Sequence, residues 1–197
     1  YYYEKENKKY DENSKLKLIY AGKFSRAKGV IYLLKAFEKI KDKYNIELIL
    51  AGSGTGEEYE EIISYSNKLS DYVKLYGYMT MQEISDLFRV CDIFVMPSFY
   101  EGLSLVTIEA MACGLNVVMN ELENFITFVG ENIVKSKNIE FVKMPSLYDT
   151  DKIIESEVED YIERLSKALE NQINNLYKNN FEKDFSSKIM RFSWENI

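Results

Sequence analysis

The sequence contains no histidine and only two cysteines among its 197 residues. The absence of histidine excludes Ser-His-Asp and Cys-His catalysis within this chain, and it removes the commonest zinc ligand. Cys91 and Cys113 both stand in apolar contexts, which favours buried, reduced thiols over a disulfide or a metal site. Any chemistry here must therefore use carboxylates, lysines, backbone amides or a partner domain.

Long apolar runs and an excess of positive charge are also missing. No apolar run reaches the roughly 18 residues that a membrane-spanning helix needs, and we see no secretory signal. The net charge of −7 argues against nucleic acid as the main partner, because phosphate backbones attract basic surfaces. With 46% apolar and 29% charged residues, the composition is that of an ordinary globular domain.

Strand-like and helix-like segments alternate along the chain. Apolar strand patterns occupy residues 16–21, 46–51, 72–76, 93–96 and 116–119, and amphipathic helical patterns stand between them. This alternation predicts an α/β fold with a doubly wound parallel sheet, a single Rossmann-like domain. We divide the chain into a linker or ragged terminus (1–15), the domain itself (16–180) and a final helix (181–197). Residues 139–144 are a candidate for a last strand.

Four candidate ligand-binding loops follow the predicted strands. They lie at the carboxyl ends of the strands, where ligands of such sheets bind. The first runs from Gly22 to Gly29 and carries two lysines ahead of a helix, which suits a diphosphate by charge and by helix dipole. The second, 52–56, is rich in glycine and permits close backbone approach to a ligand, although a plain turn explains it equally well. The third, 77–79, and the loop around Glu101 lie at the same rim.

Two carboxylates flank the start of one predicted helix. Glu101 lies in the loop after the strand 93–96, and Glu109 lies on the helix, which we expect to end near Gly114. The helix N-terminus near Ser104 is a ready anion site. One carboxylate can hold a diol ahead of the anion and the other a diol behind it. A nucleotide sugar has this layout: a ribose diol, a diphosphate and the hydroxyls of the sugar. The plain alternative is two solvated glutamates.

The stretch Glu101-Gly102-Leu103-Ser104 followed by Glu109-Ala110-Met111-Ala112-x-Gly114 resembles the retaining glycosyltransferases of the GT-B fold, above all family 4. Their loop Gly-Arg-x4-Lys-Gly is similar to Gly22-Lys23-x4-Lys28-Gly29 here. The resemblance runs from residue 16 to about 119 and returns at 192–195, which look like the start of the family's closing helix. It implies a domain that binds a nucleoside-diphosphate sugar.

The resemblance also implies roles for individual residues. Glu101, Lys28 and Lys23 would act in catalysis through electrostatic roles on the donor side. The nucleotide-sugar site would comprise Gly22, Lys23, Lys28, Ser53, Gly54, Gly77, Tyr78, Met79, Glu101, Gly102, Leu103, Ser104 and Glu109. We expect no metal, and we expect no cofactor besides the donor substrate.

Two departures from the family pattern stand out. Lys23 replaces an arginine, which keeps the charge but loses the planar fork, and Arg26 is a candidate substitute. After the fifth strand the family has a glycine pair, whereas residues 120–125 contain no glycine. Sugar or acceptor contacts in that region are therefore not predicted.

The resulting hypothesis is the C-terminal half of a glycosyltransferase that moves a hexose to an acceptor with retention of anomeric configuration. A missing N-terminal domain would supply the acceptor site, so this chain alone should be inactive. We expect a cytoplasmic enzyme, or one held at the inner membrane face through that missing domain. The alternatives are a GT-B nucleotide-sugar epimerase and a non-catalytic nucleotide-binding or scaffold module.

Overall fold

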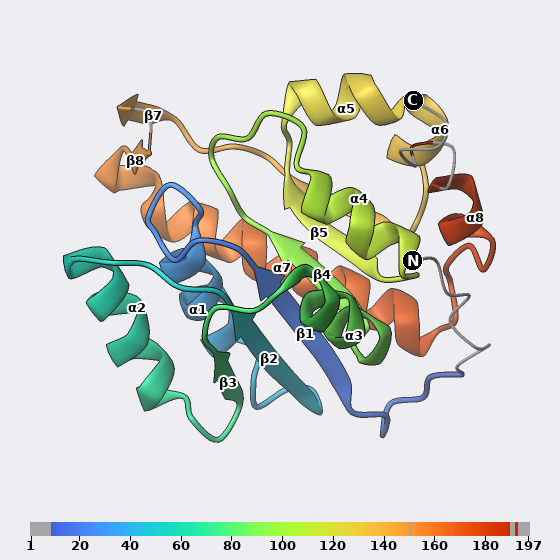
Figure 1. Cartoon of the computed structure of the whole chain (residues 1–197), viewed down its shortest axis with the longest axis horizontal. Helices are drawn as coiled ribbons and strands as arrows, with labels where there is room; N and C mark the ends of the chain where they lie inside the picture. The colour runs from blue at the N-terminus through green and yellow to red at the C-terminus, as the bar shows by residue number, and fades with distance from the viewer. Residues whose placement is uncertain (1–8, 150, 190–191, 193–197) are drawn as a thin grey trace.

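A six-stranded parallel sheet forms the centre of the protein (Figure 1), of which the computed structural model describes residues 9–149, 151–189 and 192. The strand order is β3-β2-β1-β4-β5-β6, and every pairing is parallel. The strands are β1 (Leu16–Ala21), β2 (Ile46–Ala51), β3 (Val73–Tyr76), β4 (Ile93–Met96), β5 (Asn116–Asn120) and β6 (Ile139–Val142). The predicted doubly wound fold is confirmed, and its topological switch point lies between β1 and β4.

Helices cover both faces of this sheet (Figure 1). One face carries α1 (Val30–Glu38), α2 (Glu57–Lys68) and the long α7 (Val158–Tyr177), which follows a 3₁₀ turn at Glu155–Glu157. The opposite face carries α3 (Met81–Val90), α4 (Leu105–Ala112) and α8 (Phe185–Ile189). Two short helices, α5 (Glu123–Val129) and α6 (Glu131–Val134), connect β5 to β6, and a small hairpin is formed by β7 (Leu147–Asp149) and β8 (Lys152–Ile153).

Local sequence signals explain where these helices begin and end. Thr80 and Glu83 form a reciprocal capping box at the start of α3, since each side chain bonds the backbone N–H of the other. The last turn of α4 closes at Gly114, whose φ of 79° is the left-handed conformation that glycine accepts at helix ends. The side chains of β4 and β5 are all buried, because helices cover both faces of the central strands.

The amino ends of the strands are closed by buried polar groups. Tyr10 is buried and donates its hydroxyl hydrogen to Asp92 Oδ1 at 2.9 Å, while Asp92 Oδ2 accepts the backbone N–H of Lys17 at 2.8 Å. The predicted linker 1–15 therefore packs on the domain at Tyr10. A second group joins the side chains of Asn116, Asn138 and Gln172 to one another.

The remaining structural predictions have mixed outcomes. Cys91 and Cys113 are buried thiols, as predicted. Of the predicted final helix (181–197), the structure describes residues 181–189 and 192, and its helix α8 begins only at Phe185. The sequence position of Trp194, three residues from the last residue of the sequence, also leads us to expect that it packs poorly in this domain, and this prediction lies outside the described residues. Among the described helices, none combines the length with the apolarity needed to cross a membrane.

Candidate functional site

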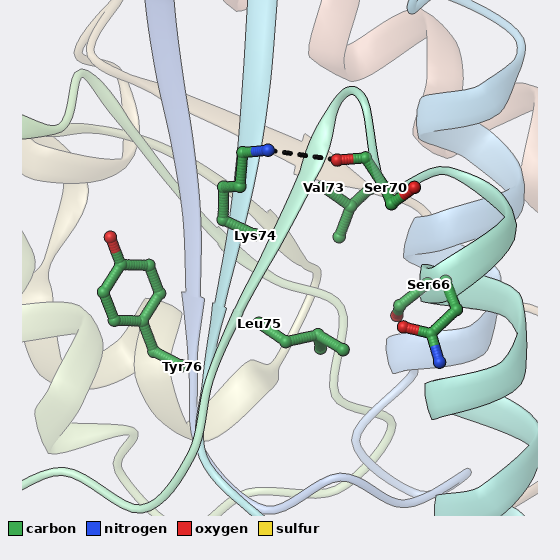
Figure 2. A pocket seen from close by; sticks show the side chains of 7 residues that line it. Ser66, Ser70, Val73, Lys74, Leu75 and Tyr76 are labelled. Atoms are coloured by element: carbon green, nitrogen blue, oxygen red, sulfur yellow. Dashed lines mark hydrogen bonds between the residues drawn. The ribbon is translucent and has the colours of Figure 1, made fainter.

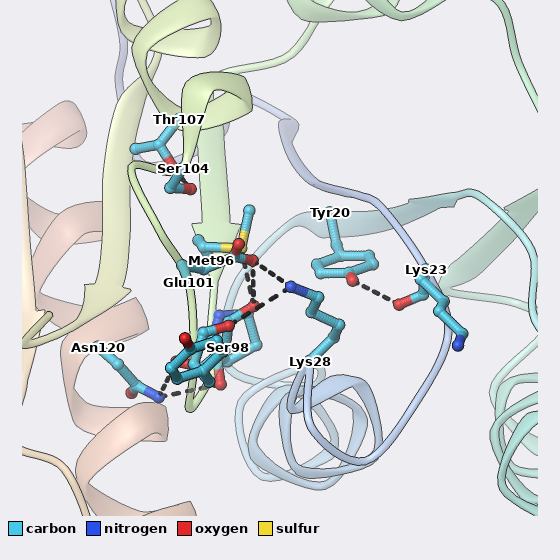
Figure 3. A network of polar contacts seen from close by, with 11 residues as sticks. Tyr20, Lys23, Lys28, Met96, Ser98, Glu101, Ser104, Thr107 and Asn120 are labelled. Carbon is cyan, nitrogen blue, oxygen red and sulfur yellow. Dashed lines mark hydrogen bonds and ion pairs between the residues drawn. The ribbon is translucent and has the colours of Figure 1, made fainter. Parts of the chain in front are cut away.

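The loops that follow β1 and β4 bring Lys28 and Glu101 into direct contact at the switch point (Figure 3). Lys28 Nζ donates to Glu101 Oε1 at 2.6 Å, and Ser98 Oγ donates to the same oxygen at 3.0 Å. Both side chains of the pair are only partly exposed, 28% for Lys28 and 19% for Glu101. Two residues of the predicted nucleotide-sugar site thus lie side by side.

Backbone contacts tie these two loops together. Phe99 donates its N–H to the carbonyl of Ala27 at 2.9 Å. Gly29 has a φ of 71°, and a Cβ at this position would stand 2.1 Å from the carbonyl oxygen of Pro97. Only glycine allows so close an approach, so Gly29 sets how near the lysine loop comes to the glutamate loop.

Five helices, α1 to α5, begin at this rim, and their first turns differ in charge. The first turns of α1 and α4 hold no acidic side chain, whereas those of α2, α3 and α5 do: Glu57, Glu58 and Glu60 in α2, Glu83 in α3 and Glu123 in α5. Acidic side chains satisfy the positive end of a helix dipole and repel other anions. The helix ends open to an anion are therefore those of α1 and α4, which flank the switch point.

The start of α4 has an unusual backbone at Ser104. Its φ of 49° is left-handed, and its buried Oγ forms a hydrogen bond of 2.7 Å with Thr107 Oγ1 rather than capping a backbone N–H. Gly102 is exposed and Leu103 is partly buried beside it. Unlike the side chain of most N-cap residues, that of Ser104 therefore leaves the first backbone N–H groups of α4 uncapped.

Glu109 lies further along α4 and faces solvent. Nearby protein removes part of the water around its carboxyl group, and this desolvation raises the pKa of Glu109. Within the described part of the chain, no side chain forms a hydrogen bond or an ion pair with the Glu109 carboxylate. The structure therefore places the two glutamates differently: Glu101 is engaged with a lysine, while Glu109 is open to a ligand.

The lysine loop holds Lys23 and Arg26 in different ways. Lys23 has an exposed side chain, and its carbonyl accepts the hydroxyl of Tyr20 at 2.7 Å. Arg26 turns to α2, where its guanidinium donates to Glu61 at 3.0 Å and its backbone N–H donates to Glu58. Because Arg26 is held by two glutamates of α2, it does not serve as the candidate substitute named from the sequence.

The glycine-rich loop 52–56 packs against neighbouring loops. Phe24 donates its N–H to the Ser53 carbonyl at 2.8 Å, and a Cβ on Gly54 would stand 2.4 Å from the Phe24 carbonyl oxygen. Gly52 donates to the carbonyls of Tyr76 and Gly77 at 3.1 Å. Close approach at Gly54 is therefore required by the loop beside it, which supports the plain-turn alternative.

The loop after β3 lies at the same rim but two strands from the switch point. Gly77 and Tyr78 are exposed, Tyr78 at 83%, and Met79 is partly buried. In the sheet, β2 and β1 separate β3 from β4, so these residues lie apart from the Lys28–Glu101 pair. A ligand that touched both would have to extend along the rim.

Three residues that bear on this site were not predicted from the sequence: Ser98, Asn120 and Tyr161. Ser98 bonds Glu101, Asn120 bonds two carbonyls of the loop after β4, and Tyr161 bonds Asn120 (Figure 3 shows the first two). The one available signal was a polar residue, Asn120, at the end of an apolar strand. Tyr161 is hidden in the hydrophobic stripe of α7.

A separate hollow of about 410 Å³ lies between α2 and the edge strand β3 (Figure 2). Its lining consists of Ser66, Asn67, Ser70, Val73, Lys74, Leu75 and Tyr76, none of which is a predicted site residue. Lys74 crosses it to donate to the Ser70 carbonyl. The hollow lies at β3, and β2 and β1 separate this strand from the charged groups at the switch point. We therefore do not assign the ligand site to the hollow.

Residues suited to a metal do not gather anywhere in the described ranges. Across 9–149, 151–189 and 192, no group of three His, Cys, Asp or Glu side chains is placed as metal ligands would be. The absence of a metal requirement stays a prediction, because a donor diphosphate can itself bring a cation.

Comparison with known proteins places this geometry in a family. The family model described as glycosyl transferases group 1 matches residues 3–185. The chain is 25% identical over 189 residues to the lipopolysaccharide 1,2-N-acetylglucosaminetransferase of Salmonella typhimurium, covering 91% of this chain and 45% of that protein. The chain spans less than half the length of the curated relatives it matches.

Solved structures share the fold. The C-terminal domain of a group 1 glycosyl transferase, LpcC of Francisella tularensis, superposes with a TM-score of 0.61 at 17% identity, over 91% of this chain and 86% of that one. The HepE protein of Anabaena, crystallised with UDP and glucose, gives 0.56 at 19% identity, over 93% of this chain and 49% of that one. With a family model that matches nearly the whole sequence, this chain belongs to the group 1 glycosyltransferases.

Proposed function

We propose that this chain is the donor-binding half of a retaining glycosyltransferase that moves a hexose from a nucleoside-diphosphate sugar without a metal ion. The observation that carries the proposal is the Lys28–Glu101 pair, 2.6 Å apart at the switch point and beside the acid-free start of α4. A cation and an open helix end suit a diphosphate, and a carboxylate next to them suits sugar hydroxyls. The HepE structure, which holds UDP and glucose, supports this choice of ligand.

In the proposed complex the diphosphate lies between the two lysines and the start of α4. Lys28, Lys23 and the backbone amides around Ser104 stabilise negative charge that develops on the leaving diphosphate, which is electrostatic catalysis. Glu101 accepts hydrogen bonds from the transferred sugar. Glu109, open on the helix behind, accepts hydrogen bonds from the ribose diol.

The base would lie towards the loop after β3. Gly22, Ser53 and Gly54 line the rim between Lys28 and that loop, and Gly77, Tyr78 and Met79 end it. The exposed Tyr78 ring and the backbone of Gly77 are available to a flat heterocycle. A ligand extended along the rim would pass these six residues, with Gly54 kept small by the loop beside it.

Transfer needs an acceptor site that we place in another domain of the full enzyme. The chain covers less than half of its curated relatives, so the remainder of such an enzyme has room for a second domain. A closed cleft between the two domains would exclude water from the reacting sugar. We therefore expect this chain alone to bind donor without transferring it.

A thermal-shift screen of the purified chain against nucleotide sugars, repeated in EDTA, tests this proposal. Binding to the folded state alone stabilises a protein by about 2.7 kcal/mol at a hundredfold excess over Kd, which is readily seen. We expect one nucleotide sugar to raise the melting temperature more than the others, with EDTA making no difference. If no nucleotide sugar raises it, the scaffold alternative holds. Binding that vanishes in EDTA and returns with magnesium would overturn the metal-free part.

A further inference from the structure

Asn120 ends β5 at the point where the sequence departs from the family pattern. Its side chain is fully buried, at 0% exposure. Asn120 Nδ2 donates one hydrogen to the Pro97 carbonyl at 2.9 Å and the other to the Ser98 carbonyl at 3.0 Å (Figure 3). These two carbonyls belong to the loop that leads directly to Glu101.

Tyr161 fixes the other end of the same amide. Its hydroxyl, presented from α7, donates to Asn120 Oδ1 at 2.9 Å. The ring contacts those of Tyr32 and Phe99, with centroids 5.8 Å and 5.4 Å away. Burial raises the pKa of Tyr161, so its hydroxyl remains a hydrogen-bond donor at neutral pH.

With its oxygen held by Tyr161, the Asn120 amide has one orientation, and both its hydrogens face the loop. The loop then presents Ser98, whose Oγ donates to Glu101 Oε1 at 3.0 Å. A continuous series of hydrogen bonds therefore runs from α7 through β5 to the carboxylate. In contrast, the buried polar groups at the amino ends of the strands contact none of the predicted site residues.

We propose that Asn120 and Tyr161 are positioning residues, which hold the loop 97–101 so that Glu101 faces the sugar of the donor. The inference rests on the proposed function. It gives residues on β5 and α7, outside the four predicted loops, a part in sugar recognition. It also predicts that their loss is felt by a ligand that carries a sugar more than by a bare nucleotide.

The test is calorimetry of the purified chain with UDP and UDP-glucose as probes. Tyr161→Phe removes the hydroxyl and keeps the ring. Its matched control is Tyr32→Phe, because Tyr32 belongs to the same ring cluster but its hydroxyl makes no hydrogen bond among the described residues. We expect Tyr161→Phe to weaken UDP-glucose by about three- to tenfold and UDP by less than about twofold, the loss of one buried hydrogen bond. Tyr32→Phe should change neither affinity.

A double-mutant cycle shows whether the effect passes through Glu101. In a Glu101→Ala background, Tyr161→Phe should cause no further loss of UDP-glucose, because interactions made through one group do not add. Asn120→Ala, a second variant of the same series, should behave like Tyr161→Phe. Equal losses for both probes, no loss for either, or full additivity with Glu101→Ala would each overturn the positioning role.

Hydrogen exchange separates this inference from the proposed function, since it needs no ligand. We expect faster exchange of backbone amides in 97–104 for Tyr161→Phe and unchanged exchange for Tyr32→Phe. If the wild type binds neither probe and no nucleotide sugar from the screen, the proposed function is wrong. If exchange in 97–104 is also unchanged, the positioning role is wrong independently of any ligand.

Discussion

The polar groups at the amino ends of the strands (the amino edge) and the charged groups at their carboxyl ends (the carboxyl edge) are used in opposite ways. At the amino edge, Asp92, Asn116, Asn138 and Gln172 are each 3% exposed or less, and protein groups serve as their partners. At the carboxyl edge, Lys28 and Glu101 are partly exposed and Glu109 faces solvent. Buried polar groups with complete partners stabilise a fold, whereas half-exposed charges with exchangeable partners are available to a ligand.

Gly29→Ala would break this comparison most severely, because it damages stability and the site together. A Cβ 2.1 Å from the Pro97 carbonyl oxygen, on a left-handed backbone, forces the lysine and glutamate loops apart. We expect a loss of about 3 kcal/mol or more, measured by urea unfolding. Gly56→Ala is the comparison: its backbone (φ 81°, ψ −172°) is also one that essentially only glycine adopts, at a cost of about 1–3 kcal/mol, but an added Cβ would meet nothing within 4 Å. Equal losses for the two variants would contradict the steric argument.

Asp92→Ala should act on stability alone. It leaves the Tyr10 hydroxyl and the Lys17 N–H without their buried acceptor, which costs about 2–4 kcal/mol in unfolding free energy. The exposed Asp86, paired with Arg89, is the control, and Asp86→Ala should cost less than about 0.5 kcal/mol. Nucleotide binding by the folded fraction of Asp92→Ala should match the wild type. A selective loss of binding would show that the amino edge is not purely structural.

The two glutamates should fail differently, which sharpens the comparison within the carboxyl edge. Glu109→Ala should weaken a nucleoside diphosphate and its nucleotide sugar alike, by about tenfold, since both carry the ribose diol. Glu101→Ala should weaken only the nucleotide sugar, and it should leave the bare diphosphate unchanged or tighter because Lys28 is released. Four dissociation constants decide this, with circular dichroism to confirm folding. Equal losses for both ligands in Glu101→Ala would mean that the ligand lies in the reverse direction.

The smallest expected effect concerns pH. Desolvation raises the pKa of Glu109 in the folded state, so its contribution to stability is fully present below its ordinary pKa and is lost as pH rises through the raised value. Glu109→Gln removes this titration. Between pH 4 and pH 7 the wild type should therefore lose slightly more stability than Glu109→Gln, a difference that solvent reduces. If urea unfolding shows that the wild type and Glu109→Gln lose equal stability across this range, Glu109 is not desolvated.

The sequence predicted the fold well because the relevant signals are local. The apolar strands and the Thr80–Glu83 capping box each depend on neighbouring residues, and the alternation of elements leaves few topologies. It also predicted that Lys28 and Glu101 share a rim, since parallel strands end at one edge. It did not show that they form an ion pair, which depends on the side-chain directions of two loops 73 residues apart.

What the sequence could not show are contacts between distant elements. Arg26 is as basic as Lys23, and only the packing of α2 reveals that Glu58 and Glu61 hold it. Tyr161 lies in the hydrophobic stripe of α7, so the sequence pattern does not distinguish it from any other buried tyrosine. The burial of Tyr10 likewise depends on Asp92, which stands just before β4, 82 residues further along the chain.

The ion pair at the switch point bears on turnover if the chain works as proposed. A donor that displaces Lys28 from Glu101 supplies sugar hydroxyls, so the carboxylate exchanges one partner for another. After transfer, the nucleotide product retains its diphosphate but has no sugar to occupy Glu101. The carboxylate then competes with the product for Lys28, and the re-formed pair favours product release over product retention.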